Sequence, residues 1–143
     1  APEPVAYNSF GNGAAMRVSG AGWLADEAPA VAALADRITA ITHNHPEGLK
    51  GARATAHAIL RARQGADADH IRNEIVTRFG YDLSFTVDEI RPYYQFNETC
   101  QETVPQALVC ALTATGFEDA IRSAISIGGD SDTVAAIAGG DCC

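Results

Sequence analysis

The chain has 143 residues, of which 47% are hydrophobic and 20% are charged. This composition excludes an intrinsically disordered chain, and the length favours one core over two. A formal net charge of −8 without a basic stripe argues against nucleic acid as a partner. The sequence shows neither a membrane-spanning apolar run nor a signal peptide. The cysteines, Cys100, Cys110, Cys142 and Cys143, form no CxxC pair. A reducing, cytoplasmic setting is therefore expected, with Cys100 and Cys110 as small buried hydrophobes.

Helical spacing and cap residues predict six helices. Asp26 is a candidate N-cap, Pro46 suits a helix start, and Gly80 suits the position just after a helix end. Thr103, with Gln106 three residues later, fits a capping box. The predicted helices cover residues 27–41, 46–63, 69–79, 103–116, 118–125 and 133–138.

The evidence for strands is confined to one short segment. Residues 83–87 alternate between apolar and polar side chains and predict a single strand. Residues 1–25 and 81–102 are expected to form long irregular loops, which are uncommon in a compact domain unless they have a function. The sequence therefore predicts an all-α domain with functional loops between its helices.

The sharpest chemical signal is the segment 126–133, which reads SIGGDSDT. Asp130, Asp132 and Thr133 can supply three oxygen ligands to a hard divalent cation directly before an apolar helix. The alternative is a purely structural pair of N-cap residues. The neighbouring glycines, Gly128 and Gly129, favour the metal interpretation because they permit an unusual backbone path.

Two further loops carry candidate binding residues. The segment Gly11–Asn12–Gly13–Ala14 can expose backbone N–H groups before a helix, an arrangement that binds phosphate. At residues 42–47, His43 is a candidate for lining a ligand site, whereas the two histidines of His-Asn-His need further ligands to hold a metal. Solvation is the expected role of the loop acids Glu98 and Glu102, and surface or packing positions are expected for His57 and His70.

Taken together, four segments resemble the ADP-ribosylglycohydrolase family. They are residues 9–17 (SFGNGAAMR), 42–48 (THNHPEG), 100–107 (CQETVPQA) and 126–140 (SIGGDSDTVAAIAGG), which occur in the family's order. The last is the most specific, and the resemblance spans nearly the whole chain.

The resemblance implies an orthogonal multi-helical fold with a binuclear magnesium or manganese site. The family's Asp-x-Asp-Thr ligands map onto Asp130, Asp132 and Thr133. The loop from Gly11 to Ala14 would line the diphosphate of ADP-ribose, with His43 in the same cleft. The implied reaction is hydrolysis of the glycosidic bond at C1″ of the distal ribose, in which Asp130 and Asp132 are the candidate catalytic carboxylates.

The chain departs from the family pattern at both ends. It contains no Thr-Asp-Asp metal motif, and the family continues with more helix after the final residues. We therefore expect a single partial domain over residues 1–143, truncated at both ends, with weakened metal binding. The apolar faces that such a truncation would expose predict a homodimer. The alternatives are a glycosidase for another sugar that uses a carboxylate pair without metal, and a non-catalytic ligand-binding protein.

Overall fold

The computed structural model describes residues 8–141, and within this range the chain forms nine helices and no strand. The prediction of an all-α fold is confirmed. None of the helices within residues 8–141 is long and apolar enough to cross a membrane. The helices are α1 (Gly13–Met16), α2 (Ser19–Leu24), α3 (Ala28–Thr39), α4 (Pro46–Arg63), α5 (Ala68–Phe79), α6 (Val87–Ile90), α7 (Cys100–Thr113), α8 (Phe117–Ser126) and α9 (Ser131–Asp141).

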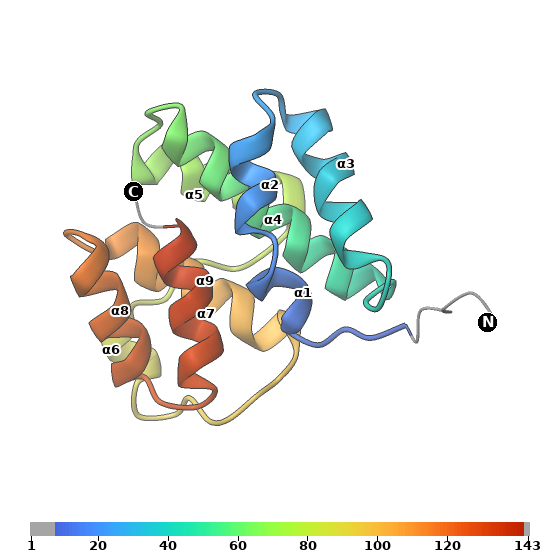
Figure 1. Ribbon diagram of the computed structural model, residues 1–143. Coiled ribbons are helices and arrows are strands. Elements are labelled where there is room, and N and C mark those ends of the chain that lie inside the picture. Colours follow the sequence, from blue (N-terminus) through green and yellow to red (C-terminus); the bar gives the residue numbers. More distant parts are fainter. Residues whose placement is uncertain (1–7, 142–143) are drawn as a thin grey trace.

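Two helices, α4 and α7, form the centre of the molecule. α4 contacts α1, α2, α3, α5, α7 and α9, and α7 contacts α1, α5, α6, α8 and α9 as well (Figure 1). Small side chains allow this close packing. A Cβ at Gly51 of α4 would lie 2.8 Å from the Sγ atom of Cys100 at the start of α7. The two helices can therefore approach each other only because residue 51 is glycine.

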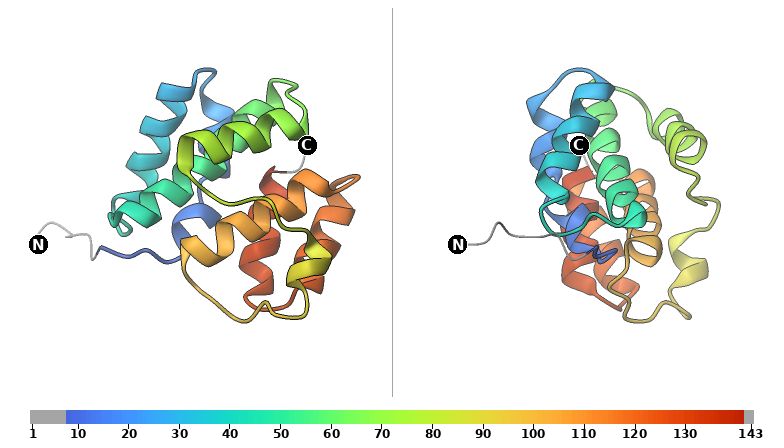
Figure 2. Two further views of the ribbon diagram at one scale, coloured as in Figure 1. Left: turned by 180° about the vertical axis from the view of Figure 1, so that it is seen from behind. Right: turned by 90° about the vertical axis from the view of Figure 1, so that its right-hand side faces the viewer.

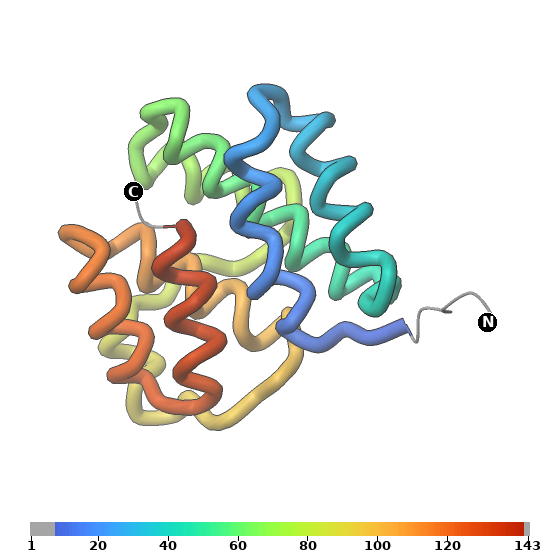
Figure 3. Tube along the Cα trace, viewed as in Figure 1, coloured from blue at the N-terminus to red at the C-terminus, as the bar shows by residue number. Residues whose placement is uncertain are grey.

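The remaining helices cover this centre in two groups. α2 and α3 pack on α4, whereas α8 and α9 pack on α7. α1 contacts α4, α7 and α9, and so lies where the two groups meet (Figure 3). The segment that leads from α5 to α7 runs along the opposite side of the molecule and carries α6 (Figure 2). The junction around α1 brings together segments that are far apart in the sequence.

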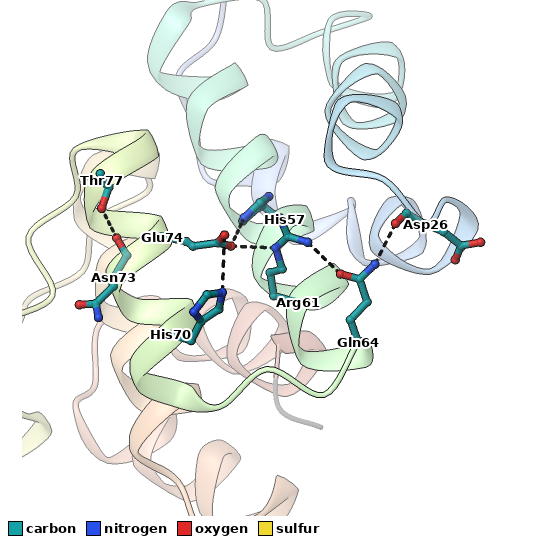
Figure 4. A network of polar contacts seen from close by, with 8 residues as sticks. All are labelled: Asp26, His57, Arg61, Gln64, His70, Asn73, Glu74 and Thr77. Atoms are coloured by element: carbon teal, nitrogen blue, oxygen red, sulfur yellow. Dashed lines mark hydrogen bonds and ion pairs between the residues drawn. The ribbon is translucent and has the colours of Figure 1, made fainter.

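A polar network fastens α5 to α4 (Figure 4). Glu74 of α5 accepts hydrogen bonds from His57 Nε2 at 2.7 Å and from Arg61 Nε at 2.8 Å, both on α4. Burial by itself would raise the pKa of Glu74, but these two partners hold it at about 2. Burial also lowers the pKa of His57, whose ring lies against Phe79. His57 is thus a packing residue, as predicted.

Of the predicted helix ends, the one at Gly80 is confirmed, and those at Asp26, Thr103 and Gly116 are wrong. Gly80 adopts a left-handed conformation with φ 71° directly after α5, as predicted. The N-cap of α3 is Glu27 rather than Asp26, whose carboxylate instead forms an ion pair with Arg63. α7 begins at Cys100, so the capping box at Thr103 is wrong, and Thr103 is buried inside the helix. α7 also ends at Thr113, and Gly116 is the N-cap position of α8.

The two predicted loops contain more helix than expected, and the predicted strand is absent. Residues 1–25 were expected to be irregular, yet the described part of this stretch includes α1 and α2. Residues 83–87 form no strand. Leu83 is buried and Ser84 is exposed, which explains the alternation, but Thr86 is the N-cap of α6 in a capping box with Glu89. The segment is extended against the helices without a neighbouring strand to pair with.

The cysteine prediction is confirmed where the structure describes it. Cys100 and Cys110 are free and buried, and burial raises the pKa of their thiols to about 12 and about 11. Both thiols are therefore unreactive at neutral pH. Cys142 and Cys143 lie outside the described residues.

Candidate functional site

The loop before α1 is held by the segment before α7. Cys100 donates its backbone N–H to the carbonyl of Phe10 at 2.9 Å, and Asn12 donates its backbone N–H to the carbonyl of Glu98 at 2.6 Å. Gly11 and Thr99 form an isolated antiparallel bridge between these contacts. The thiol of Cys100 also contacts the carbonyl of Gly11, which lies 89 positions earlier in the chain. Residues 10–12 are thus fixed by a segment that is distant in the sequence.

Asn12 lies at the centre of the resulting polar cluster, and only 7% of it is exposed. Its Nδ2 atom donates to Asp130 Oδ2 at 2.7 Å, and it also contacts Thr103 Oγ1 at 3.2 Å and the carbonyl of Asn97 at 3.4 Å. Residues 12 and 130 are 118 positions apart. One buried carboxamide therefore connects the glycine-containing loop to the acidic motif.

The two aspartates of that motif lie against each other. A hydrogen bond with the carboxyl group of Asp130 lowers the pKa of Asp132, and Asp132 Oδ1 also accepts the backbone N–H of Thr133 at 2.9 Å. Asp130 is half-buried and Asp132 is exposed. Two carboxylates so close together repel each other, and a cation bound between them would relieve that repulsion.

The backbone of residues 128–129 explains the two glycines. Both residues have positive φ angles, 76° at Gly128 and 69° at Gly129, which side chains other than glycine adopt at a cost. A Cβ at Gly129 would also lie 2.5 Å from the ring of Tyr94. The glycines let the chain turn sharply into α9 with Tyr94 packed over the turn.

Asn12 also lines a cavity of about 560 Å³. It is lined by residues 8–13 together with His43, Glu98 and Thr99. His43 is 6% exposed, and burial followed by the nearby charge of Arg17 lowers its pKa. The volume of the cavity falls in the range typical of sites for small molecules.

The loop from Gly11 to Ala14 does not offer all its N–H groups to a ligand. The N–H of Gly11 donates to Ser9 Oγ at 3.1 Å, that of Asn12 to Glu98, and that of Ala14 to the carbonyl of Gly11 at 3.3 Å. The side chain of Ala14 is fully buried in the core. Binding at this loop would therefore depend on Gly13 and on the side chains around it.

The residues singled out from the sequence thus fall into two adjacent sets. Gly11, Asn12, Gly13 and His43 line the cavity, while Asp130 is hydrogen-bonded to the side chain of Asn12 and is followed in the chain by Asp132 and Thr133. Asn97, which belongs to the polar segment 95–102 that leads into α7, contributes its backbone carbonyl, and Tyr94, to which the sequence did not point, contributes its ring. Thr103 was interpreted as a cap, although the same hydroxyl contacts Asn12.

The donor atoms fit a hard divalent cation in kind. Two carboxylates in contact and a threonine at the next position are oxygen ligands of the type that Mg²⁺ and Mn²⁺ prefer. The number of such ligands is small. Residues 8–141 contain no group of three or more histidine, cysteine, aspartate or glutamate side chains arranged to hold a metal.

Comparison with known families agrees with the resemblance seen in the motifs. The family model for ADP-ribosylglycohydrolase matches residues 1–140, and the chain belongs to this family. No curated protein matches the chain. Membership of this family suggests a glycohydrolase activity on ADP-ribosyl linkages.

Proposed function

We propose that this protein is a metal-assisted hydrolase that cleaves the glycosidic bond of ADP-ribosyl linkages. The observation that supports this most is the hydrogen bond of 2.7 Å from Asn12 Nδ2 to Asp130 Oδ2. Asn12 also lines the cavity, so an extended ligand held there could place one end at the aspartate pair.

In this proposal the two sets of residues divide the work. Gly11, Asn12, Gly13 and His43 bind the diphosphate part of the ligand, whereas Ala14, whose side chain is buried and whose N–H donates to the carbonyl of Gly11, fixes the turn of the loop. Asp130, Asp132 and Thr133 hold Mg²⁺ or Mn²⁺, which when bound would orient the distal ribose and a water molecule.

The reaction needs a base for water and a proton for the leaving group. Water adds to C1″ of the distal ribose while the bond from C1″ to the leaving group breaks. One carboxylate of the Asp130–Asp132 pair takes the proton from water and passes it to the leaving group, so that the carboxylate is regenerated. Asn12 keeps the Asp130 carboxylate in place through its hydrogen bond.

The proposal is tested by hydrolysis assays on an ADP-ribosylated protein and on a simple aryl glycoside, each with and without chelator. Release of ADP-ribose that stops on chelation and returns with Mg²⁺ or Mn²⁺ supports it. Activity on the aryl glycoside that survives chelation would instead show a carboxylate pair acting without metal. Absence of turnover on both substrates, with ADP-ribose still bound, would make the protein a binding protein.

Self-association is the second part of the proposal. Several large apolar side chains are exposed, with Trp23 57% and Leu24 75% exposed at the end of α2. The apolar side chains of α9 do not contribute to this surface, because Val134, Ile137 and Ala138 are buried. We expect a dimer at micromolar concentration by light scattering. A mass near 15.0 kDa at high concentration would contradict this expectation.

A further inference from the structure

Tyr94 connects the turn before α9 to the first turn of α7. Its hydroxyl donates to the backbone carbonyl of Glu102 at 2.9 Å, and its backbone N–H donates to the carbonyl of Ile90, the last residue of α6, at 2.8 Å. The ring packs against Gly129, because a Cβ at that position would lie 2.5 Å from Cε1 and 2.9 Å from Cδ1 of Tyr94. Tyr94 is therefore anchored to two helices, and its ring contacts the residue that directly precedes Asp130.

The turn before α9 needs support from outside because two successive glycines form it. Gly128 and Gly129 both have positive φ angles, and glycine adopts other backbone conformations just as readily. A Cβ at Gly128 would meet no atom within 4 Å, so this side of Gly128 is open, whereas the same side of Gly129 is covered by Tyr94. The conformation from which Asp130 enters α9 therefore depends on the contact between Tyr94 and Gly129.

The same loop also reaches the carboxylate of Asp130 through Asn12. The backbone carbonyl of Asn97, three residues after Tyr94, accepts a hydrogen bond from Asn12 Nδ2 at 3.4 Å. Asn12 Nδ2 also donates to Asp130 Oδ2 at 2.7 Å. The segment between α6 and α7 runs beside the start of α9 in two views (Figures 1 and 2). Residues 94–97 thus contact both the backbone that precedes Asp130 and the amide that binds its carboxylate.

We propose that Tyr94 is a positioning residue for the aspartate pair: its ring holds the turn at Gly129 so that the Asp130 carboxylate meets Asn12 and lies against Asp132. The flat, rigid ring supplies the packing surface that a glycine turn lacks. The hydroxyl fixes the ring to α7 through its hydrogen bond. The consequence for a divalent cation rests on the proposed function, whereas the consequence for the contact between Asp130 and Asn12 does not.

The side-chain amide signals of Asn12 in ¹H–¹⁵N spectra of the metal-free whole protein report this contact, and an Asn12→Ala variant identifies them. Tyr94→Leu should raise the solvent exchange rate of this amide about tenfold, whereas Tyr94→Phe, which keeps the ring, should raise it about twofold or less. Tyr93→Leu is the matched control, because Tyr93 is 80% exposed, and it should leave the rate unchanged. An unchanged rate in Tyr94→Leu, or an equal rise in Tyr94→Phe or Tyr93→Leu, would overturn the inference.

Two glycine variants test the same contact from the other side. Gly128→Ala and Gly129→Ala both place an alanine in the left-handed conformation, at a similar backbone cost. Only the Cβ at residue 129 would collide with the ring of Tyr94. The amide exchange rate of Asn12 should therefore rise about tenfold in Gly129→Ala and about twofold in Gly128→Ala. Equal changes in the two variants, with the helix content of both retained by circular dichroism, would overturn the inference.

Titration with Mn²⁺ alone, followed by calorimetry, tests the consequence for a cation. Tyr94→Leu should weaken Mn²⁺ binding about tenfold relative to the parent, and Tyr94→Phe about twofold or less. Unchanged Mn²⁺ affinity in Tyr94→Leu would overturn this part of the inference. Absence of Mn²⁺ binding by the parent at millimolar concentration would instead count against the proposed function, and the Asn12 signals would still decide the role of Tyr94.

Discussion

Two polar clusters of this molecule differ in the partners that surround their carboxylates. In the α4–α5 network, Glu74 is surrounded by His57, Arg61 and, at 3.7 Å, His70. At the start of α9, Asp130 and Asp132 lie against each other, and the side-chain donor to Asp130 is the neutral amide of Asn12. Among residues 8–141, no lysine, arginine or histidine forms an ion pair with either aspartate. A carboxylate that is balanced by the Arg61 guanidinium and hydrogen-bonded by His57 fastens two helices together, whereas two carboxylates in contact without such a partner favour a cation from solution.

Asp132 gives the sharpest test of this difference. Asp132→Asn should lower hydrolysis about a thousandfold, because it removes both a candidate cation ligand and a candidate base. The free energy of unfolding should change little, since the side chain is exposed. Metal titration calorimetry and turnover of an ADP-ribosylated protein check the two effects.

The matched control is Asp67→Asn, which alters another exposed aspartate at the start of a helix. Asp67 accepts the N–H of His70 at 2.8 Å and is the N-cap of α5. Activity should be unchanged in this variant. Equal losses in both variants would mean that Asp132 acts only through the stability of its helix.

Glu74 should show the opposite behaviour. Glu74→Ala is expected to lower the free energy of unfolding by about 2–3 kcal/mol, because it leaves the buried His57 ring and the Arg61 guanidinium without their shared partner. Urea unfolding measures this loss, and affinity for ADP-ribose should not change. Asp88→Ala, which removes an exposed ion pair with Arg91, should cost about 0.5 kcal/mol or less. A comparable loss of unfolding free energy in both variants would contradict the idea that Glu74 fastens α5 to α4.

Asp141 is a third case, because it is buried without any cation. It is 5% exposed, both its carboxylate oxygens lack a hydrogen-bond partner among residues 8–141, and burial raises its pKa well above 3.8. Asp141→Asn should raise the free energy of unfolding at neutral pH by about 1–2 kcal/mol, since a neutral amide is cheaper to bury than a carboxylate.

The pH dependence of stability should separate Asp141 from Glu74. For Asp141 the folded pKa is above the unfolded one, so its contribution is complete below pH 3.8 and is lost as the pH rises towards the folded pKa. For Glu74 the folded pKa of about 2 is below the unfolded value of 4.5, so its contribution is complete above 4.5 and is lost as the pH falls towards 2. Urea unfolding measures the free energy of unfolding across this pH range. The loss of stability with rising pH should vanish in Asp141→Asn, and the loss with falling pH should vanish in Glu74→Ala.

Gly13 tests whether the cavity belongs to the same site as the aspartates. Gly13→Val should weaken ADP-ribose binding about tenfold, because the new side chain would meet His43 Nε2 and Arg17 Nη2, each 3.4 Å from the Cβ position. The helix content should be unchanged by circular dichroism. Gly20→Val is the control, because a Cβ at Gly20 meets no atom within 4 Å. If ADP-ribose protects both variants equally against heat, this loop does not bind the diphosphate.

The sequence by itself determined the all-α class, most helix positions and the family. These depend on local signals, such as the helical spacing in α4, the left-handed glycine after α5 and the acidic motif before α9. It failed where the outcome depends on distant partners. Thr103 looked like a cap, but the backbone of residues 97–100 pairs with the loop before α1, so that α7 begins earlier and buries Thr103. Residues 83–87 alternated like a strand, but a strand needs a neighbour, and the helices supply none in the described structure.

Only the tertiary structure decided how the candidate residues meet. The contact between Asn12 and Asp130 joins positions 118 residues apart, and the side chain of Asn12 alone contains nothing that selects Asp130. Packing of α1 against α7 and α9 brings the two together and excludes water from the amide. Motifs are local because a few neighbouring residues can set a turn or supply ligands. A site is not, because its geometry depends on which helices share a buried surface.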